Sequence, residues 1–281
     1  MSMSGGIDIA LIQTRTPATA RDALAHVEPL IRQAASTGAR FILTPEGTNL
    51  LEQRRERRDA AVLDEDQDVA VLGLRRLAAE LGVWLLIGSA IVRSGRAGEG
   101  RAANRSLLVD SSGAITARYD KLHVFDVDLP NGERYRESAT VRPGDRAVAA
   151  DTPWGRLGLT VCYDIRFPHL HRQLAKAGAS MIAIPAAFTA PTGEAHWETL
   201  LRARAIETGA FVLAPAQGGL HEDGRRTWGR STVVGPWGEI IAKADHDEPC
   251  IVMAKLDMEA VRRARAAVPA LTHDRDFLPV S

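Results

Sequence analysis

Short apolar runs alternate with longer segments that carry apolar residues at helical spacing, from one end of the chain to the other. Ile7 to Gln13 is mostly apolar, which predicts a buried strand. Residues 18–36 place Leu24, Val27 and Ile31 on one face of a helix. A strand followed by an amphipathic helix is the repeating unit of an α/β protein.

The same alternation continues to the C-terminus. Further strands are predicted at residues 41–43, 83–92, 106–110, 114–119, 157–161, 181–184, 211–214, 231–234, 239–242 and 250–254. Further helices are predicted at residues 69–81, 170–177, 196–208 and 258–266. Turn residues at 112–113 and 236–238 predict two hairpins. The fold class predicted by this pattern is α/β, with helices covering sheets.

One stretch is strongly charged and breaks the pattern. Arginines at positions 54, 55, 57 and 58 are followed by acidic residues at 59, 64, 65, 66 and 68. Opposite charges in neighbouring blocks are typical of a solvated surface, so we interpret this stretch as a loop and a helix start rather than as a partner-binding site.

Charge and composition exclude several classes of protein. The chain of 281 residues has 35 Lys and Arg against 35 Asp and Glu, whereas nucleic-acid binders carry a basic excess. No apolar run approaches the roughly 18–20 residues of a membrane span. Met1 to Gly6 contains no Lys or Arg to begin a signal peptide. We therefore expect a cytoplasmic protein with no nucleic-acid partner and no membrane partner.

Three residues at predicted strand ends are candidates for chemistry: Cys162, Glu46 and Lys121. Ligands gather at the carboxyl ends of strands in open α/β sheets. Each residue also has a plain structural interpretation, with Cys162 as a buried core cysteine, Glu46 as the cap of the next turn and Lys121 as a surface charge. The second cysteine, Cys250, lies inside a predicted strand and is interpreted as a core residue.

Together the three residue types suit acyl transfer. A thiol nucleophile needs a base that removes its proton, and a carboxylate in a dry cleft can act as that base. A nearby ammonium would lower the pKa of the thiol and stabilise an oxyanion. The spacing of these residues along the chain does not by itself identify an active site. At this point the catalytic interpretation and the structural interpretation of the three residues both remain open.

Five longer stretches favour the chemical alternative. They are Leu43–Glu46, Tyr119–Asp128, Val161–Pro168, Ala195–Glu207 and Gly229–Gly238. In these stretches the chain resembles the nitrilase superfamily of carbon–nitrogen hydrolases, and its Nit-type amidase branch in particular. The motif Cys-Tyr-Asp-x-Arg-Phe-Pro at residues 162–168 is highly specific. The resemblance runs from about residue 7 to residue 278, which implies a single domain over residues 1–281 with a C-terminal tail from about residue 257.

The resemblance implies a fold and a role for each candidate. The fold would be a four-layer α-β-β-α sandwich, assembled as a homodimer or a larger homo-oligomer. Cys162 would be the nucleophile, Glu46 the general base and Lys121 the cation that holds the oxyanion. Glu137 would support the lysine, and the backbone N–H of Tyr163 would complete the oxyanion hole. The reaction would pass through a cysteine thioester and would need no cofactor and no metal.

The substrate implied by the resemblance is a small linear amide that carries carboxylates. Deaminated glutathione is the substrate favoured by residues 187–193 and 214–217, whereas residues 228–234 are closer to an ω-amidase acting on 2-oxoglutaramate. An N-carbamoyl amidohydrolase and a true nitrilase are further alternatives. A catalytically silent binding protein is the alternative from a different class, and the presence of all three catalytic residue types argues against it.

Arginines would suit the carboxylates of such a substrate, because a guanidinium binds a carboxylate with two parallel hydrogen bonds. The candidates are Arg166, Arg204 and Arg230. Glu198 and Glu207 on the same predicted helix offer Arg202 and Arg204 ion-pair partners instead, and we favour that interpretation.

Three positions depart from the family's usual residues. Asp120 stands where a basic residue is usual, His169 where Glu is usual, and Arg230 where His is usual. None of the three is the proposed nucleophile, general base or catalytic lysine. The departures therefore bear on which substrate is bound rather than on the catalytic residues.

Overall fold

The computed structural model describes residues 6–130 and 132–278. The remaining residues include most of the N-terminal segment on which the absence of a signal peptide was predicted, and that prediction lies outside the described residues. None of the helices in the described part of the chain combines the length and the apolar character needed to cross a membrane.

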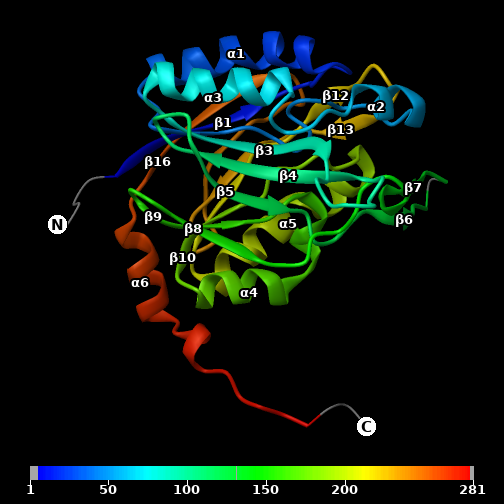
Figure 1. Ribbon diagram of the computed structural model, residues 1–281. Helices are drawn as coiled ribbons and strands as arrows, with labels where there is room; N and C mark the ends of the chain where they lie inside the picture. Colours follow the sequence, from blue (N-terminus) through cyan, green and yellow to red (C-terminus); the bar gives the residue numbers. More distant parts are fainter. Residues whose placement is uncertain (1–5, 131, 279–281) are drawn as a thin grey trace.

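Two six-stranded sheets form the body of the molecule (Figure 1). The first has the strand order β16 (Cys250–Leu256), β1 (Ile7–Gln13), β2 (Phe41–Leu43), β3 (Trp84–Arg93), β4 (Ala102–Val109), β5 (Ile115–Asp120). The second has the order β15 (Ile240–Lys243), β14 (Thr232–Val234), β11 (Phe211–Ala214), β10 (Ala179–Ala183), β9 (Gly155–Leu159), β8 (Val148–Thr152). Two small hairpins complete the strands, β6 (Asp126–Asp128) with β7 (Arg134–Arg136), and β12 (Gly218–Leu220) with β13 (Arg226–Trp228).

Helices cover the outer face of each sheet. The pair α1 (Ala20–Ser36) and α3 (Val69–Leu81) packs on the first sheet, and α4 (Pro168–Lys176) and α5 (Ala190–Thr208) pack on the second (Figure 1). Two shorter helices, α2 (Arg55–Ala61) and α6 (Glu259–Ala267), lie outside these layers. The predicted four-layer α-β-β-α sandwich is therefore confirmed.

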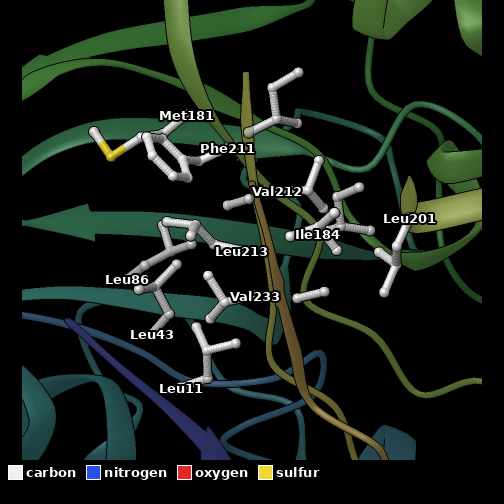
Figure 2. Close-up of a cluster of buried hydrophobic side chains, with 14 of the residues drawn as sticks. Leu11, Leu43, Leu86, Met181, Ile184, Leu201, Phe211, Val212, Leu213 and Val233 are labelled. Atoms are coloured by element: carbon white, nitrogen blue, oxygen red, sulfur yellow. The ribbon is translucent and has the colours of Figure 1, made fainter. Parts of the chain in front are cut away.

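The largest apolar core lies between the two sheets, where apolar side chains from facing strands interdigitate and exclude water. The first sheet contributes Leu11, Leu43 and Leu86, and the second contributes Phe211, Leu213 and Val233 (Figure 2). All six are buried. Alternate residues of each strand point into this core, and a shift of one residue would turn them to the opposite face of the sheet. The core therefore fixes the register of each strand and with it the position of the strand's end.

Most predicted elements agree with the structure within one or two residues, and α5 is the main exception. The sequence predicts a start at residue 196, whereas α5 begins at Ala190. Pro191 lies in the first turn of α5, where proline is tolerated. A side chain at Gly193 would collide with Trp228, since a Cβ there would lie 2.2 Å from its ring. Packing against Trp228 therefore requires a glycine inside this helix.

The strand directions bring the candidate residues to one end of the molecule. In the first sheet β2 and β3 are parallel, and two antiparallel steps return β5 to the same direction. Glu46 after β2 and Lys121 after β5 therefore leave the sheet at the same end. In the second sheet β9 and β10 are parallel, and Cys162 follows β9. The Ala187 N–H beyond β10 donates to Glu46 Oε2 over 2.9 Å, so the carboxyl ends of the two sheets meet.

Candidate active site

A cavity of about 320 Å³ opens at this end of the two sheets. Six of the predicted site residues line it: Glu46, Lys121, Glu137, Cys162, Tyr163 and Arg166. Arg230 does not line it, so the structure does not bring this predicted substrate-binding residue to the site. The predicted catalytic and oxyanion residues thus share one cavity, although they come from four separate segments of the chain.

The loop that carries Glu46 is fixed by hydrogen bonds to β3. Thr44 Oγ1 donates to the Leu86 carbonyl over 3.1 Å and accepts from the Gly88 N–H over 3.1 Å. A Cβ at Gly88 would lie 1.8 Å from the Thr44 carbonyl oxygen and 2.5 Å from Pro185 of the second sheet. Glycine at this position therefore lets the two sheets approach directly beside Glu46.

Cys162 occupies an unusual backbone conformation. Its φ of 50° lies in the left-handed region, which non-glycine residues adopt at some cost and often at functional sites. The Cys162 N–H donates to the Pro185 carbonyl over 2.8 Å, and the residue begins a 3-10 turn that runs to Arg166. The sharp reversal after β9 turns the thiol toward the cavity and away from the sheet.

Lys121 lies between two carboxylates, and all three charges are largely buried. Its Nζ donates to Glu46 Oε1 over 2.9 Å and to Glu137 Oε2 over 2.8 Å. Glu137 also accepts from the Phe125 N–H over 2.6 Å. The Lys121 side chain is 2% exposed, so solvent screens these contacts very little.

The sequence analysis did not identify Asn104, which bridges the same two carboxylates. Its Nδ2 donates to Glu46 Oε1 over 2.9 Å and to Glu137 Oε1 over 3.2 Å. Its backbone carbonyl accepts from the Lys121 N–H. Asn104 is the third residue of β4, which begins four residues before the predicted strand 106–110, so the sequence analysis left Asn104 outside the sheet.

The buried charges shift each other's pKa. Burial alone would lower the pKa of Lys121, but the carboxylates of Glu137 and Glu46 outweigh it and hold this pKa well above 10.5. Burial would likewise raise the pKa of Glu46, yet the Lys121 charge and the hydrogen bonds from Lys121 and Asn104 lower it below 4.5. Lys121 is therefore an ammonium and Glu46 a carboxylate at neutral pH.

The sequence analysis expected a nearby ammonium to lower the pKa of the Cys162 thiol, but in the structure this pKa is raised. Burial raises this pKa, the Glu46 charge raises it further, and the opposing effect of Lys121 is smaller, so the pKa lies well above 9.0. The thiol and the Glu46 carboxylate line the same cavity. The resting pair is thus a neutral thiol beside an ionised carboxylate rather than a preformed thiolate.

Asp164 joins the nucleophile's turn to the strand that precedes Lys121. It is fully buried and accepts from the Tyr119 hydroxyl over 2.7 Å, from the Val161 N–H over 2.8 Å and from the His123 N–H over 3.0 Å. The Tyr119 hydroxyl in turn accepts from the Leu122 N–H. One carboxylate therefore sets the relative position of the Cys162 turn and the segment after β5.

The predicted arginines have different surroundings. The Arg166 guanidinium carbon lies 5.4 Å from the Phe188 ring centroid and 6.0 Å from that of Tyr163, and Nη2 lies 3.3 Å from His196 Nδ1. Arg204 instead pairs with Glu207 over 2.8 Å, as predicted.

Arg202 does not make the ion pair predicted for it. Its Nε donates to the Gly238 carbonyl over 2.9 Å, whereas Glu198 pairs with Lys243 over 2.9 Å. The β14–β15 hairpin packs against α5 and supplies these partners, which the helix sequence alone could not reveal.

None of the three positions that depart from the family pattern lines the cavity. Asp120 pairs with Arg105 over 2.6 Å and with Arg142, so an acidic residue here has two cationic partners. The His169 ring meets the edge of Phe167. Arg230 lies with its guanidinium carbon 5.2 Å from the Trp228 ring centroid, outside the cavity wall.

The cavity also contains arginines that the sequence analysis did not assign to it. They are Arg55, Arg58, Arg134, Arg136 and Arg225. Arg55 and Arg58 belong to the charged block that was interpreted as a solvated loop and helix start; α2 does begin at Arg55 and has no buried residue, and these two arginines also line the cavity. Among the described residues, no group of three or more His, Cys, Asp and Glu side chains is arranged to hold a metal ion.

The family model for carbon–nitrogen hydrolases matches residues 8–266, so the chain belongs to the carbon–nitrogen hydrolase family. It is an enzyme of the class that hydrolyses carbon–nitrogen bonds, and the family predicted from the motifs is confirmed.

Particular relatives narrow the class to amidases. A protein of Yersinia enterocolitica named deaminated glutathione amidase is 43% identical over 269 residues, which are 95% of this chain and 93% of that protein. The structure of Saccharomyces cerevisiae Nit3, of branch 10 of the nitrilase superfamily, matches with a TM-score of 0.85 and 27% identity over 97% of each chain. A variant of the Nesterenkonia sp. AN1 amidase, with acrylamide added to its active-site cysteine, matches with a TM-score of 0.76 and 27% identity over 94% of this chain and 98% of that chain.

We predict that Asp164→Asn lowers the free energy of unfolding by about 2 kcal/mol or more, because the new amide would place an N–H against donors inside the core. Tyr119→Phe removes one donor and leaves the carboxylate with its backbone partners, so about 1 kcal/mol is expected. Urea unfolding of both variants measures the two values.

Asp110→Asn is the matched control, since Asp110 also accepts from backbone N–H groups but in an exposed turn. A loss for Asp164→Asn no larger than that for the control would contradict the role of Asp164 in joining the two segments.

Proposed function

We propose that the chain hydrolyses deaminated glutathione, a linear amide with a carboxylate at each end, through a thioester on Cys162. The observation that carries the chemistry is that the Cys162 thiol shares the wall of one cavity with the Glu46 carboxylate, which the Lys121 Nζ holds over 2.9 Å. The name of the relatives that match nearly the whole chain supports the choice of substrate.

In the first half of the reaction, Cys162 Sγ attacks the amide carbonyl carbon while Glu46 accepts the thiol proton. The Lys121 ammonium and the Tyr163 N–H stabilise the oxyanion that forms. Glu46 then returns the proton to the departing nitrogen, and the C–N bond breaks. Cysteinylglycine leaves as the amine, and the 2-oxoglutaryl group stays on the sulfur.

In the second half, Glu46 accepts a proton from a water molecule that attacks the thioester. The C–S bond breaks, the proton returns to the sulfur, and 2-oxoglutarate leaves as the acid. Lys121 stays protonated in both halves because its two carboxylate partners raise its pKa. It therefore acts through its charge and hydrogen bonds rather than by proton transfer.

We predict that the purified protein converts deaminated glutathione to cysteinylglycine and 2-oxoglutarate, and that Cys162→Ala lowers kcat by at least about 10³-fold. Mass spectrometry identifies both products, and 2-oxoglutaramate serves as the comparison substrate. Cys250→Ala is the matched control, because this free cysteine lies outside the cavity.

Two results would contradict this assignment. A wild-type rate no higher than that of Cys162→Ala would exclude the proposed reaction. A higher kcat/KM for 2-oxoglutaramate, with release of ammonia, would make the protein an ω-amidase instead.

We also predict that kcat/KM stays flat between about pH 5 and pH 9. Glu46 must be ionised to accept the proton, and its lowered pKa means that activity is lost only as the pH falls below about 4.5. The raised pKa of Cys162 keeps the thiol protonated throughout this range. A rise in kcat/KM that follows thiol ionisation between pH 7 and pH 9 would show that a preformed thiolate is the nucleophile.

A homodimer or a larger homo-oligomer is the assembly we propose. Ile206 of α5 and Trp237 of the β14–β15 turn are 58% and 63% exposed, and Gly238 beside Trp237 packs on Ile206, so the apolar residues adjoin. A contiguous exposed apolar patch is typical of a protein interface.

Light scattering should give at least twice the mass of 30.4 kDa, and Trp237→Asp should lower it. Leu220→Asp, which changes an exposed leucine on β12, is the control. A monomeric wild-type protein would exclude the assembly. The cytoplasmic location predicted from the sequence stays a prediction that cell fractionation checks.

A further inference from the structure

The exposed side of the cavity collects arginines from three separate segments. We call this group the arginine rim and define it as Arg55 and Arg58 of α2, Arg134 and Arg136 of β7, and Arg225 of the β12–β13 turn. Arg55 and Arg134 have side chains that are 74% and 79% exposed, whereas Lys121 is 2% exposed. The rim therefore lies on the solvent side of the cavity and the reacting groups lie at its base.

The charges of the cavity wall are strongly unbalanced, although the whole chain has zero net charge. Seven cationic side chains line the cavity, against the three carboxylates of Glu46, Glu52 and Glu137. Glu46 and Glu137 both bind Lys121, and Glu52 pairs with Arg54, which is not part of the wall. Outside the wall, Asp59 pairs with Arg55 and Arg58, and Asp128 pairs with Arg134 and Arg136. The five cations of the rim thus share two carboxylates, so a positive charge remains and attracts an anion to the cavity.

Two members of the rim have hydrogen-bonding capacity that the protein does not use. The Nε atoms of Arg58 and Arg225 are buried, and neither has a hydrogen-bond partner. Arg58 contacts Asp59 through Nη2 alone, over 3.2 Å, and within the described residues no ion pair is found for Arg225. A buried donor without a partner is unfavourable, so these guanidinium groups are suited to an acceptor from a ligand.

The segments that carry these two arginines are fastened to each other. The Gln53 N–H, just before α2, donates to Asp223 Oδ2 over 2.9 Å, and the Arg225 N–H donates to Asp223 Oδ1 over 2.9 Å. In Figure 1, α2 lies beside β12 and β13. The Asp223 carboxylate, in the β12–β13 turn, therefore holds the segments of Arg58 and Arg225 together on one side of the cavity mouth.

We propose that Arg58 and Arg225 bind a second carboxylate of the substrate, at the end remote from the amide that is cleaved, and so select amides that are charged at both ends. Arg166, four residues after Cys162 in the same turn, lies nearer the reacting groups and is available for the first carboxylate. The inference rests on the proposed function and adds a requirement for a second carboxylate in the substrate. 2-Oxoglutaramate has a single carboxylate and does not meet this requirement.

The test compares two amides that differ only in the remote charge, deaminated glutathione and its C-terminal carboxamide. The wild-type kcat/KM should favour the acid by about 10- to 100-fold, as expected for charge-assisted hydrogen bonds. Arg58→Gln and Arg225→Gln should each reduce this ratio about tenfold, mainly through KM. Arg57→Gln and Arg226→Gln are matched controls on the same two segments, and neither residue lines the cavity.

The same pair of compounds is also measured by calorimetry with Cys162→Ala, which separates this inference from the proposed function. If the wild-type protein cleaves neither compound, the proposed reaction is wrong. Tighter binding of the acid than of the carboxamide, lost when Arg58 or Arg225 is replaced, would still support the inferred binding of the remote carboxylate. Equal binding of acid and carboxamide, no binding of either, or a ratio unchanged by both rim substitutions would overturn the inference.

Discussion

The ammonium of Lys121, held between the carboxylates of Glu46 and Glu137, is the interaction on which the active end of the molecule depends. Removing charges from water costs several kcal/mol for each ion, and mutual attraction offsets this only when the geometry is good. The strands β2 and β5 and the turn at Glu137 must therefore all be in place together. Any one of them alone would leave a buried charge without its partner.

The same cluster sets the reactivity of the thiol. Burial raises the pKa of the Cys162 thiol and the Glu46 charge raises it further, and the opposing effect of Lys121 is smaller, so a thiolate is disfavoured. Glu46 is thereby kept both ionised and adjacent to the proton that it must accept. A site that stored a thiolate would need a different balance of charges, so the arrangement that stabilises the fold here also determines how the sulfur is activated.

The sequence reveals those site residues that depend on regular structure. Glu46, Lys121 and Cys162 follow strands, and strand order brings strand ends together. Asn104 could not be recognised, because its role depends on which neighbours face it across β4. The rim arginines were not recognised for another reason. The segment of α2 and the β12–β13 hairpin are far apart in the sequence, and contacts such as the hydrogen bond from Gln53 to Asp223 link them. The left-handed φ of Cys162 likewise has no signature in residue type.

The position of β16 has a consequence for how the protein is made. This last strand pairs along its whole length with β1, so that Ile7 lies opposite Leu256. During translation the first sheet therefore lacks this edge strand until residues 250–256 have left the ribosome. Pairing between such distant segments is slow. In the meantime β1 presents an open, apolar edge that can pair with other nascent chains.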